Sequence, residues 1–159
     1  MLSCCKEIYG TGLEALFIAV ASAFTAQCAK FLLHLITKKE IDLTKFTTTG
    51  GMPSSHSAGV VALAVMVGVL SGFTSVDFAL ATGLALVVMY DASGVRRAAG
   101  KQAACLNKII QDFYTHDVAK FGGRLKELLG HTPLQVVMGA LYGIAFALGI
   151  HHWLSLICK

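Results

Sequence analysis

Charged residues are scarce in this chain. Of its 159 residues only 14% are charged, whereas 55% are hydrophobic and the mean hydropathy is +0.68. Soluble domains carry about 25% charged residues. The balance therefore excludes an ordinary soluble domain and predicts an integral membrane protein, and the length suggests one domain over residues 1–159.

The chain also lacks the residue spacings of a metal centre and of a nucleic-acid-binding module. We interpret its five cysteines as free thiols or small apolar residues, namely Cys4, Cys5, Cys28, Cys105 and Cys158. His151 and His152 precede Trp153, which is typical of an aromatic belt at a membrane surface. We expect no metal, no cofactor and no nucleic-acid partner.

Four apolar segments are long enough to cross a membrane as helices. A spanning helix needs about 20 mostly apolar residues, and lipid does not admit open strands. The segments run approximately over residues 13–36, 55–73, 76–90 and 133–154. The first one continues past Ala21-Ser22-Ala23, which fits a spanning helix better than a signal peptide. The predicted fold class is an all-α membrane helical bundle with about four spanning helices.

The order of these segments gathers the polar residues at one membrane face. The link at residues 71–75 is short, and the segment 91–132 is too charged to cross. The first and third spans therefore end at the face where the second and fourth begin. Ten lysines and arginines fall on this face and two on the other. This positive-inside signal predicts that the face is cytoplasmic. We expect the membrane to be a bacterial plasma membrane.

Residues 95–113 predict an amphipathic helix between the third and fourth spans. Apolar residues recur there at helical spacing, at Ala99, Ala103, Leu106, Ile110 and Phe113. We expect this cytoplasmic helix to lie on the membrane surface or to cap the site. A turn at residues 121–123 would separate it from a short helix over residues 124–129.

The segment that leads into the second span is suited to holding a phosphate. It reads Gly50-Gly51-Met52-Pro53-Ser54-Ser55-His56-Ser57. Proline fits the first turn of a helix, serine can cap it, and the free N–H groups at the helix start favour an anion. Gly51 would let the backbone approach closely. We predict substrate contacts from Gly51, Ser54 and Ser55; the alternative is a capped helix start with no ligand.

A second histidine, His131, precedes the fourth span in a similar way. Thr132 suits the N-cap position and Pro133 the first helical position. A histidine just before a helix N-terminus has its neutral form favoured, and a neutral imidazole is what a nucleophile requires. The alternative is an interfacial histidine packed at the edge of the bilayer.

Cations accompany these histidines. Arginine matches phosphate oxygens with its planar fork, and Asp91 is close enough in sequence to pair with Arg96 or Arg97 and orient it. Lys30 lies within the first span, where a charge usually faces a cavity or a partner. The alternatives are arginines that only anchor the membrane face, and a Lys30 that snorkels to the interface.

Three segments together resemble a known family. They read GGMPSSHSA at 50–58, YDASGVRRAAG at 90–100 and LKELLGHTPLQVVMGALYG at 125–143. The chain resembles the acid phosphatase/vanadium-dependent haloperoxidase-related proteins, a divergent branch of the type 2 phosphatidic acid phosphatase superfamily. The resemblance covers about residues 27–149. It implies that His56 is the general acid, that His131 attacks phosphorus to form a phosphohistidine, and that Arg96 or Arg97 is the site arginine.

The sequence departs from the superfamily pattern in two places. Gln135 stands where an aspartate would orient the nucleophilic histidine, and an amide can orient an imidazole but stabilises its positive charge less. The lysine and Arg-Pro of the first motif are absent, so that Lys30, Lys38, Lys39 or Lys45 would have to substitute for it. The chain also has fewer spans than the superfamily's six-helix core, and a homo-oligomer would complete the site.

The prediction is a metal-independent membrane phosphatase that acts on a lipid phosphate or diphosphate, with a polyprenyl lipid as one candidate. The predicted catalytic residues are His131, His56, Arg97 and Arg96, and the predicted substrate-binding residues are Lys30, Ser54, Ser55, Gly51, Asp91 and Gln135. A non-catalytic membrane protein that binds an anionic lipid or phosphate, or scaffolds a partner, is the competing interpretation. A transporter is a third, although the chain is small for one.

Overall fold

The computed structural model describes residues 7–38, 51–113, 125 and 130–158. Within these ranges the structure is helical and has no strand. The helices are α2 (Gly12–Lys38), α3 (Ser55–Ser71), α4 (Val76–Ser93), α5 (Val95–Phe113) and α6 (Pro133–Cys158). Segments Gly12–Thr37, Val76–Gln111 and Pro133–Cys158 are long and apolar enough to cross a membrane, and Ser55–Ser71 is a shorter apolar helix. The predicted all-α membrane bundle is confirmed.

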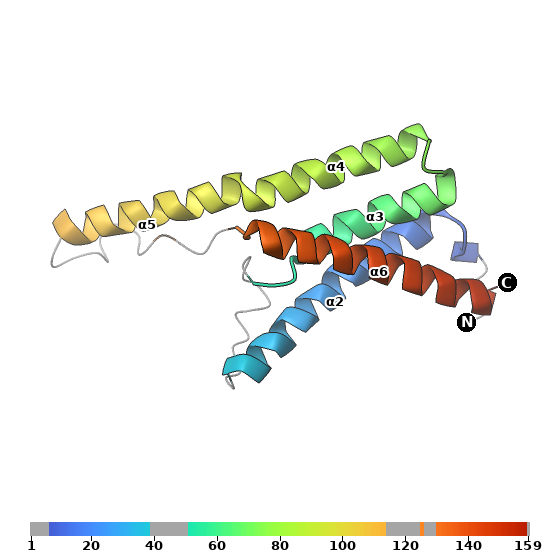
Figure 1. Ribbon diagram of the computed structural model, residues 1–159, viewed down its shortest axis with the longest axis horizontal. Helices are drawn as coiled ribbons and strands as arrows, with labels where there is room; N and C mark the ends of the chain where they lie inside the picture. Colours follow the sequence, from blue (N-terminus) through green and yellow to red (C-terminus); the bar gives the residue numbers. More distant parts are fainter. Residues whose placement is uncertain (1–6, 39–50, 114–124, 126–129, 159) are drawn as a thin grey trace.

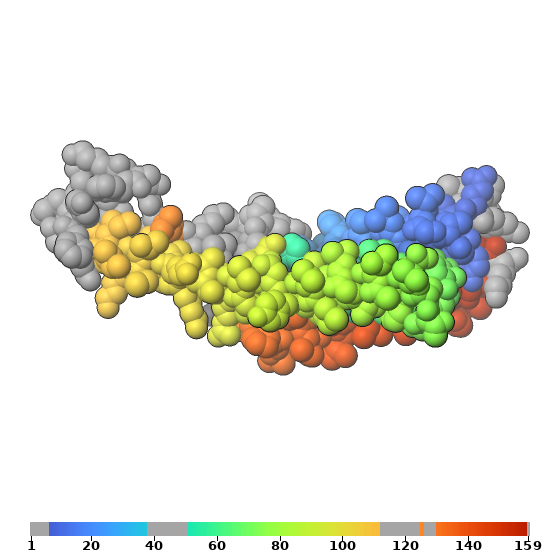
Figure 2. All heavy atoms as spheres, turned by 90° about the horizontal axis from the view of Figure 1, so that it is seen from above, coloured from blue at the N-terminus to red at the C-terminus, as the bar shows by residue number. Residues whose placement is uncertain are grey.

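Helix α3 is the centre of the bundle and packs against α2, α4 and α6. Seen from above, α4 lies in front, with α2 along one side and α6 along the other (Figure 2). The start of α2 and the end of α6 lie toward the same end, which we call the terminal end (Figure 1). The end of α2, the start of α3, the end of α4 and the start of α6 lie toward the other, which we call the site end. This is the grouping that the four-span topology predicts.

The hydrophobic core lies toward the terminal end. It is formed by Ala15, Ile18, Ala62, Met66 and Ala147, with larger apolar side chains packed around them. On α2, buried residues recur every fourth position from Glu14 to Lys30, and none of residues 31–37 is buried. Helix α2 is therefore fixed by packing over its first part, and the bundle is more open at the site end.

Glycines set the close packing of α3 against α6. A Cβ on Gly139 would overlap the carbonyl oxygen of Ser54, and a Cβ on Gly143 would overlap that of Ala58. Lipid tails are as apolar as the helices, so helix association in a membrane relies on such close contact rather than on the hydrophobic effect. These two glycines therefore hold the start of α3 beside the start of α6.

Replacing Gly139 by alanine is expected to lower the free energy of unfolding by about 1–3 kcal/mol, because the new methyl group must push α3 away from α6. The matched control is Gly149→Ala on the same helix, where nothing lies within 4 Å of an added Cβ. Alanine there should be neutral or slightly stabilising. Thermal or denaturant unfolding of the two variants in detergent measures the difference, and equal effects would contradict the packing described here.

Helix α5 was expected to lie on the membrane surface or to cap the site, and it does not fold back over the site (Figure 1). It continues α4 in nearly the same direction and extends past the end of the bundle (Figure 1). The segment Val76–Gln111 has 36 residues, about 54 Å at 1.5 Å per residue, whereas the hydrocarbon core is about 30 Å thick. Helix α5 must therefore extend beyond that core. The short helix expected over 124–129 lies, apart from Leu125, outside the described residues.

The interpretation of the cysteines was wrong in one respect. Cys158, at the end of α6, is disulfide-bonded, whereas Cys28 and Cys105 are free. Residue spacing along the chain could not reveal this bond, because it depends on the fold that returns the C-terminus of α6 to the terminal end (Figure 1). Cys4 and Cys5 lie outside the described residues.

Candidate functional site

Three helices and the segment before α6 meet around a small pocket at the site end. The pocket is lined by His56, Val88, Ala92, Arg96, Gly130 and His131. Its volume of about 10 Å³ is close to what one water molecule needs. A phosphate would need side chains to move aside. His56 and Arg96 are exposed, so both have room to do so.

The backbone at the junction of α4 and α5 positions His131. The His131 N–H donates to the carbonyl oxygen of Ala92 at 2.9 Å. Gly130, with φ +91°, lies so close to the backbone of Arg96 and Arg97 that a Cβ would overlap them. Only glycine permits both this approach and this φ. The segment that carries His131 is thus held against the same turn that carries the arginines.

A capping box at the start of α6 orients the His131 ring. Gln135 N–H donates to Thr132 Oγ1 at 3.3 Å, and Thr132 N–H donates to Gln135 Oε1 at 3.0 Å. Because a backbone N–H needs an acceptor, the amide oxygen of Gln135, and not its nitrogen, must face this group. The same oxygen lies 3.3 Å from Nδ1 of His131. Nδ1 must therefore carry a proton and donate it to Gln135.

This arrangement leaves a lone pair on Nε2 of the neutral His131 ring. His131 is only 3% exposed, and its Nε2 has no hydrogen-bond partner in the described part of the chain. Burial lowers the pKa of His131, and the positive charge of Lys30 acts in the same direction, whereas the Gln135 hydrogen bond and the Gly51 backbone oppose it. The ring is thus neutral near pH 7, with Nε2 available inside the pocket.

The structure distinguishes between the two arginines. Arg96 lines the pocket and its Nε donates to Asp91 Oδ2 at 2.7 Å, as an ion pair between half-exposed side chains. This bond uses Nε. The two terminal amino groups of the guanidinium are the donors that can form parallel hydrogen bonds to phosphate oxygens. Arg97 is exposed and does not line the pocket. The pairing predicted for Asp91 therefore involves Arg96.

Lys30 lies beside the pocket. It is 6% exposed and its amino group donates to Gln27 Oε1 at 2.9 Å. A snorkelling lysine would expose its amino group, so the interface alternative does not describe Lys30. The aliphatic part of the Lys30 side chain packs against Gly51, where an added Cβ would lie 3.0 Å from the lysine Cδ. Gly51 has φ +95°, a conformation that favours glycine.

The predicted phosphate contact of Ser54 does not agree with the structure. Ser54 is fully buried, and its Oγ accepts from the backbone N–H and the hydroxyl of Ser57 at 3.3 and 3.0 Å. Its own N–H donates to the Gln135 carbonyl oxygen at 3.2 Å. Ser54 therefore caps α3 and joins it to α6. Ser55, half-buried at the first position of α3, does not line the pocket either.

Two features of the site were not predicted from the sequence. The Thr132-x-x-Gln135 spacing is that of a capping box, and it could have shown that Gln135 faces back toward His131. The contacts of Ala92 and Gly130 have no comparable signal, because they are made by backbone atoms. Their identity as small residues was visible, but their partners depend on how α4 meets α6.

Comparison with known proteins agrees with the resemblance read from the sequence. The profile of the family described as "Divergent PAP2 family" matches residues 12–146. The chain is 40% identical over 143 residues to the uncharacterized membrane protein YuiD of Bacillus subtilis (strain 168), and the alignment covers 84% of this chain and 90% of that protein. No solved structure matches the chain significantly.

Proposed function

We propose that this chain, which belongs to the divergent PAP2 family, is a membrane phosphatase that cleaves a lipid phosphate or diphosphate at the site end of its bundle. One observation carries the proposal: the buried Nε2 of His131, which has no hydrogen-bond partner among the described residues, lies in a pocket that His56 and Arg96 also line. Phosphoryl transfer through histidine needs a nucleophile, a proton donor and a positive charge, which a neutral imidazole, a second imidazole and a guanidinium can supply.

The proposed reaction has two steps. Nε2 of His131 attacks phosphorus, the bond between phosphorus and the lipid oxygen breaks, and His56 gives a proton to the departing oxygen. Water then attacks the phosphohistidine with His56 as base, which releases inorganic phosphate and returns the electron pair to Nε2. Arg96 offsets the negative charge of the phosphoryl group in both steps. Throughout, Gln135 holds Nδ1–H and keeps Nε2 directed at the pocket.

The level of the pocket relative to the bilayer supports a lipid substrate. His131 is bonded to Ala92, close after Tyr90, whose side chain is exposed near the end of α4. Tyrosine is enriched at the headgroup level of a bilayer, and the phosphate of a lipid lies at the same level. Val88 lines the pocket from the apolar part of α4, so the lipid tail would remain in hydrocarbon. The positive-inside distribution of lysine and arginine supports placing this face in the cytoplasm.

The protonation of His131 can be measured without any substrate. Two-bond ¹⁵N–¹H spectra of histidine-labelled protein in micelles are expected to show a mainly neutral Nδ1–H tautomer at pH 6.5, because burial lowers the pKa of His131 below its ordinary value of about 6.5. Protonation should therefore occur only at lower pH. Gln135→Leu removes the acceptor and should shift the ring toward the Nε2–H tautomer, whereas Gln135→Glu keeps an oxygen there. An Nε2–H tautomer in the wild type would exclude the proposed nucleophile.

The activity itself is tested by phosphate release from purified protein. We expect release from lipid phosphates or diphosphates in mixed micelles, and much slower release from a water-soluble monoester, because only a lipid places its phosphate at the depth of the pocket. Equal rates on the two substrates would remove the argument for a lipid.

A second candidate function is binding of an anionic lipid or phosphate without turnover. The size of the pocket and the amide of Gln135 in place of a carboxylate favour it. Lipid that copurifies with the protein and is retained without any phosphate release would support this function over hydrolysis.

A further inference from the structure

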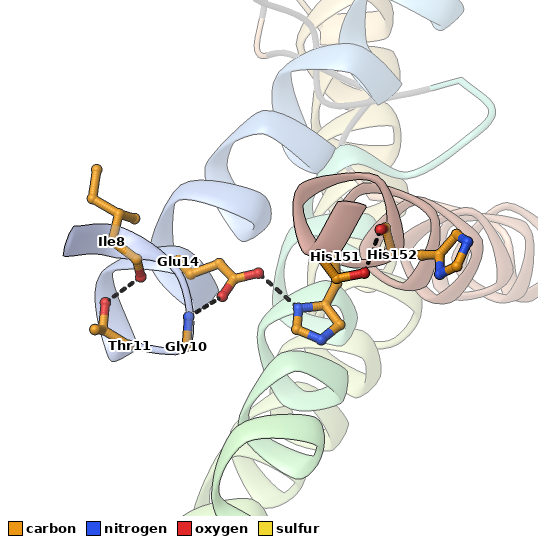
Figure 3. Close-up of polar contacts among 7 residues, drawn as sticks. Ile8, Gly10, Thr11, Glu14, His151 and His152 are labelled. Atoms are coloured by element: carbon orange, nitrogen blue, oxygen red, sulfur yellow. Dashed lines mark hydrogen bonds and ion pairs between the residues drawn. The ribbon is translucent and has the colours of Figure 1, made fainter. Parts of the chain in front are cut away.

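An acid–base pair with a fully buried carboxyl group lies at the terminal end, far from the pocket. Glu14 is fully buried in the first turn of α2, and its Oε1 accepts from Nδ1–H of His151 on α6 at 2.7 Å. Its Oε2 accepts from Gly10 N–H at 2.7 Å, and the Tyr9 ring stacks on His151 with centroids 5.5 Å apart. Figure 3 shows His151 turned toward Glu14 from the neighbouring helix, while His152 points away. An ionisable residue buried in a membrane bundle needs a functional explanation.

Helix capping explains only part of this arrangement. The bond between Oε2 and Gly10 closes the start of α2, as an acidic residue in a first turn commonly does. The bond to His151 crosses 137 positions of the chain and joins the first span to the last. A cap alone would not require the carboxylate to be buried, and burying it without His151 would be costly. The contact between α2 and α6 is therefore the part that capping leaves unexplained.

The two helices that this pair joins also carry groups at the site end. Lys30 lies further along α2, and His131 stands just before α6. At 1.5 Å per residue, Lys30 is about 24 Å from Glu14 along the helix axis, so that a tilt of about 5° at Glu14 would move Lys30 by about 2 Å. A misplacement of about 1 Å can cost about 100-fold in the rate of a positioned reaction.

We propose that Glu14 and His151 are a positioning pair, which fixes the angle between α2 and α6 and so holds Lys30 in place relative to His131. Buried residues along α2 from Glu14 to Lys30 pack the helix against its neighbours, and the bond between Glu14 and His151 adds a polar contact between α2 and α6 at the start of this packed stretch. An effect of this pair on phosphate binding rests on the proposed function, whereas its role in setting the angle between α2 and α6 does not.

The geometric role is tested by the distance between spin labels at Ile36→Cys and Val137→Cys, exposed positions on α2 and α6. Every native cysteine outside the Cys158 disulfide is replaced by serine, Cys28 and Cys105 among them. Pulsed electron resonance should give one narrow distance for this parent. Glu14→Ala and His151→Ala should broaden it or shift it by about 2 Å or more. His151→Phe keeps the stack on Tyr9 but loses the N–H donor, and it should broaden or shift the distance in the same way. This variant replaces the alanine variants in the test if they do not fold. His151→Asn, which restores an N–H donor, should return the parent distance.

The control is His152→Ala, an exposed neighbour on the same helix, which should leave the distance unchanged. The affinity for inorganic phosphate should fall about tenfold in the Glu14 and His151 variants and not in His152→Ala. A parent-like distance in His151→Phe would refute the positioning pair, whatever phosphate binding shows. If the wild type neither binds nor releases phosphate, the proposed function fails while the distances still decide the role of the pair.

Discussion

Replacing His131 by alanine is expected to lower kcat for phosphate release from a lipid phosphate by about four orders of magnitude or more, as the loss of a nucleophile does in enzymes that form a covalent intermediate. Alanine removes Nε2, the buried nitrogen of the pocket that has no partner among the described residues. The cations remain, so KM should change much less than kcat. Steady-state phosphate release in mixed micelles measures both constants.

The matched control is His152→Ala, which should keep full activity because this side chain is exposed and lies near the end of α6, whereas the pocket lies at its start. The fold of His131→Ala should be preserved, since the bond to Ala92 is made by the backbone N–H of residue 131. A His131→Ala protein that folds and retains most of its activity would exclude histidine as the nucleophile.

Replacing Arg96 by alanine should reduce kcat/KM by about 10²–10³-fold, which is the usual cost of removing one donor that stabilises a developing charge. Arg96 lines the pocket and is held there by Asp91. Arg96→Lys should recover little of the loss. An ammonium group lacks the planar set of donors with which a guanidinium can bond to Asp91 and to phosphate oxygens at the same time. The rates are measured by phosphate release from the same lipid substrate.

Arg97→Ala is the matched control for Arg96, one residue away and equally charged. Its side chain is exposed and does not line the pocket, so kcat/KM should stay within about threefold, as for a surface charge. If Arg97→Ala were the damaging change and Arg96→Ala the mild one, the assignment of the site arginine would be reversed.

The helices could be predicted because each long apolar run is bounded by polar segments. The amphipathic helix expected over residues 95–113 is observed as Val95–Phe113, and the span expected over 55–73 begins at Ser55. The direction of α5 could not be predicted. Gly94 marks the break between two helices in the sequence, but whether the chain turns there or continues α4 depends on contacts with α6 and the segment before it.

The gathering of the site residues at one end of the bundle was predictable, whereas the individual contacts were not. Counting the spans places His56, His131 and the arginines on one face whatever the details of packing. The choice between Arg96 and Arg97 depends on the rotation of α5, since adjacent residues point about 100° apart on a helix. The role of Ser54 depends on Gly139, which brings α6 against it. Neither relation is visible from local sequence.

The most direct measurement is a search for a phosphoryl group on His131. Purified protein is mixed with a lipid phosphate labelled at phosphorus, quenched in alkaline detergent, digested and examined by mass spectrometry. We predict an acid-labile, base-stable phosphoryl group on the peptide that carries His131, absent from His131→Ala. Phosphate release from the wild type without any phosphoryl group on His131, or with the group on His56 instead, would contradict the proposed mechanism.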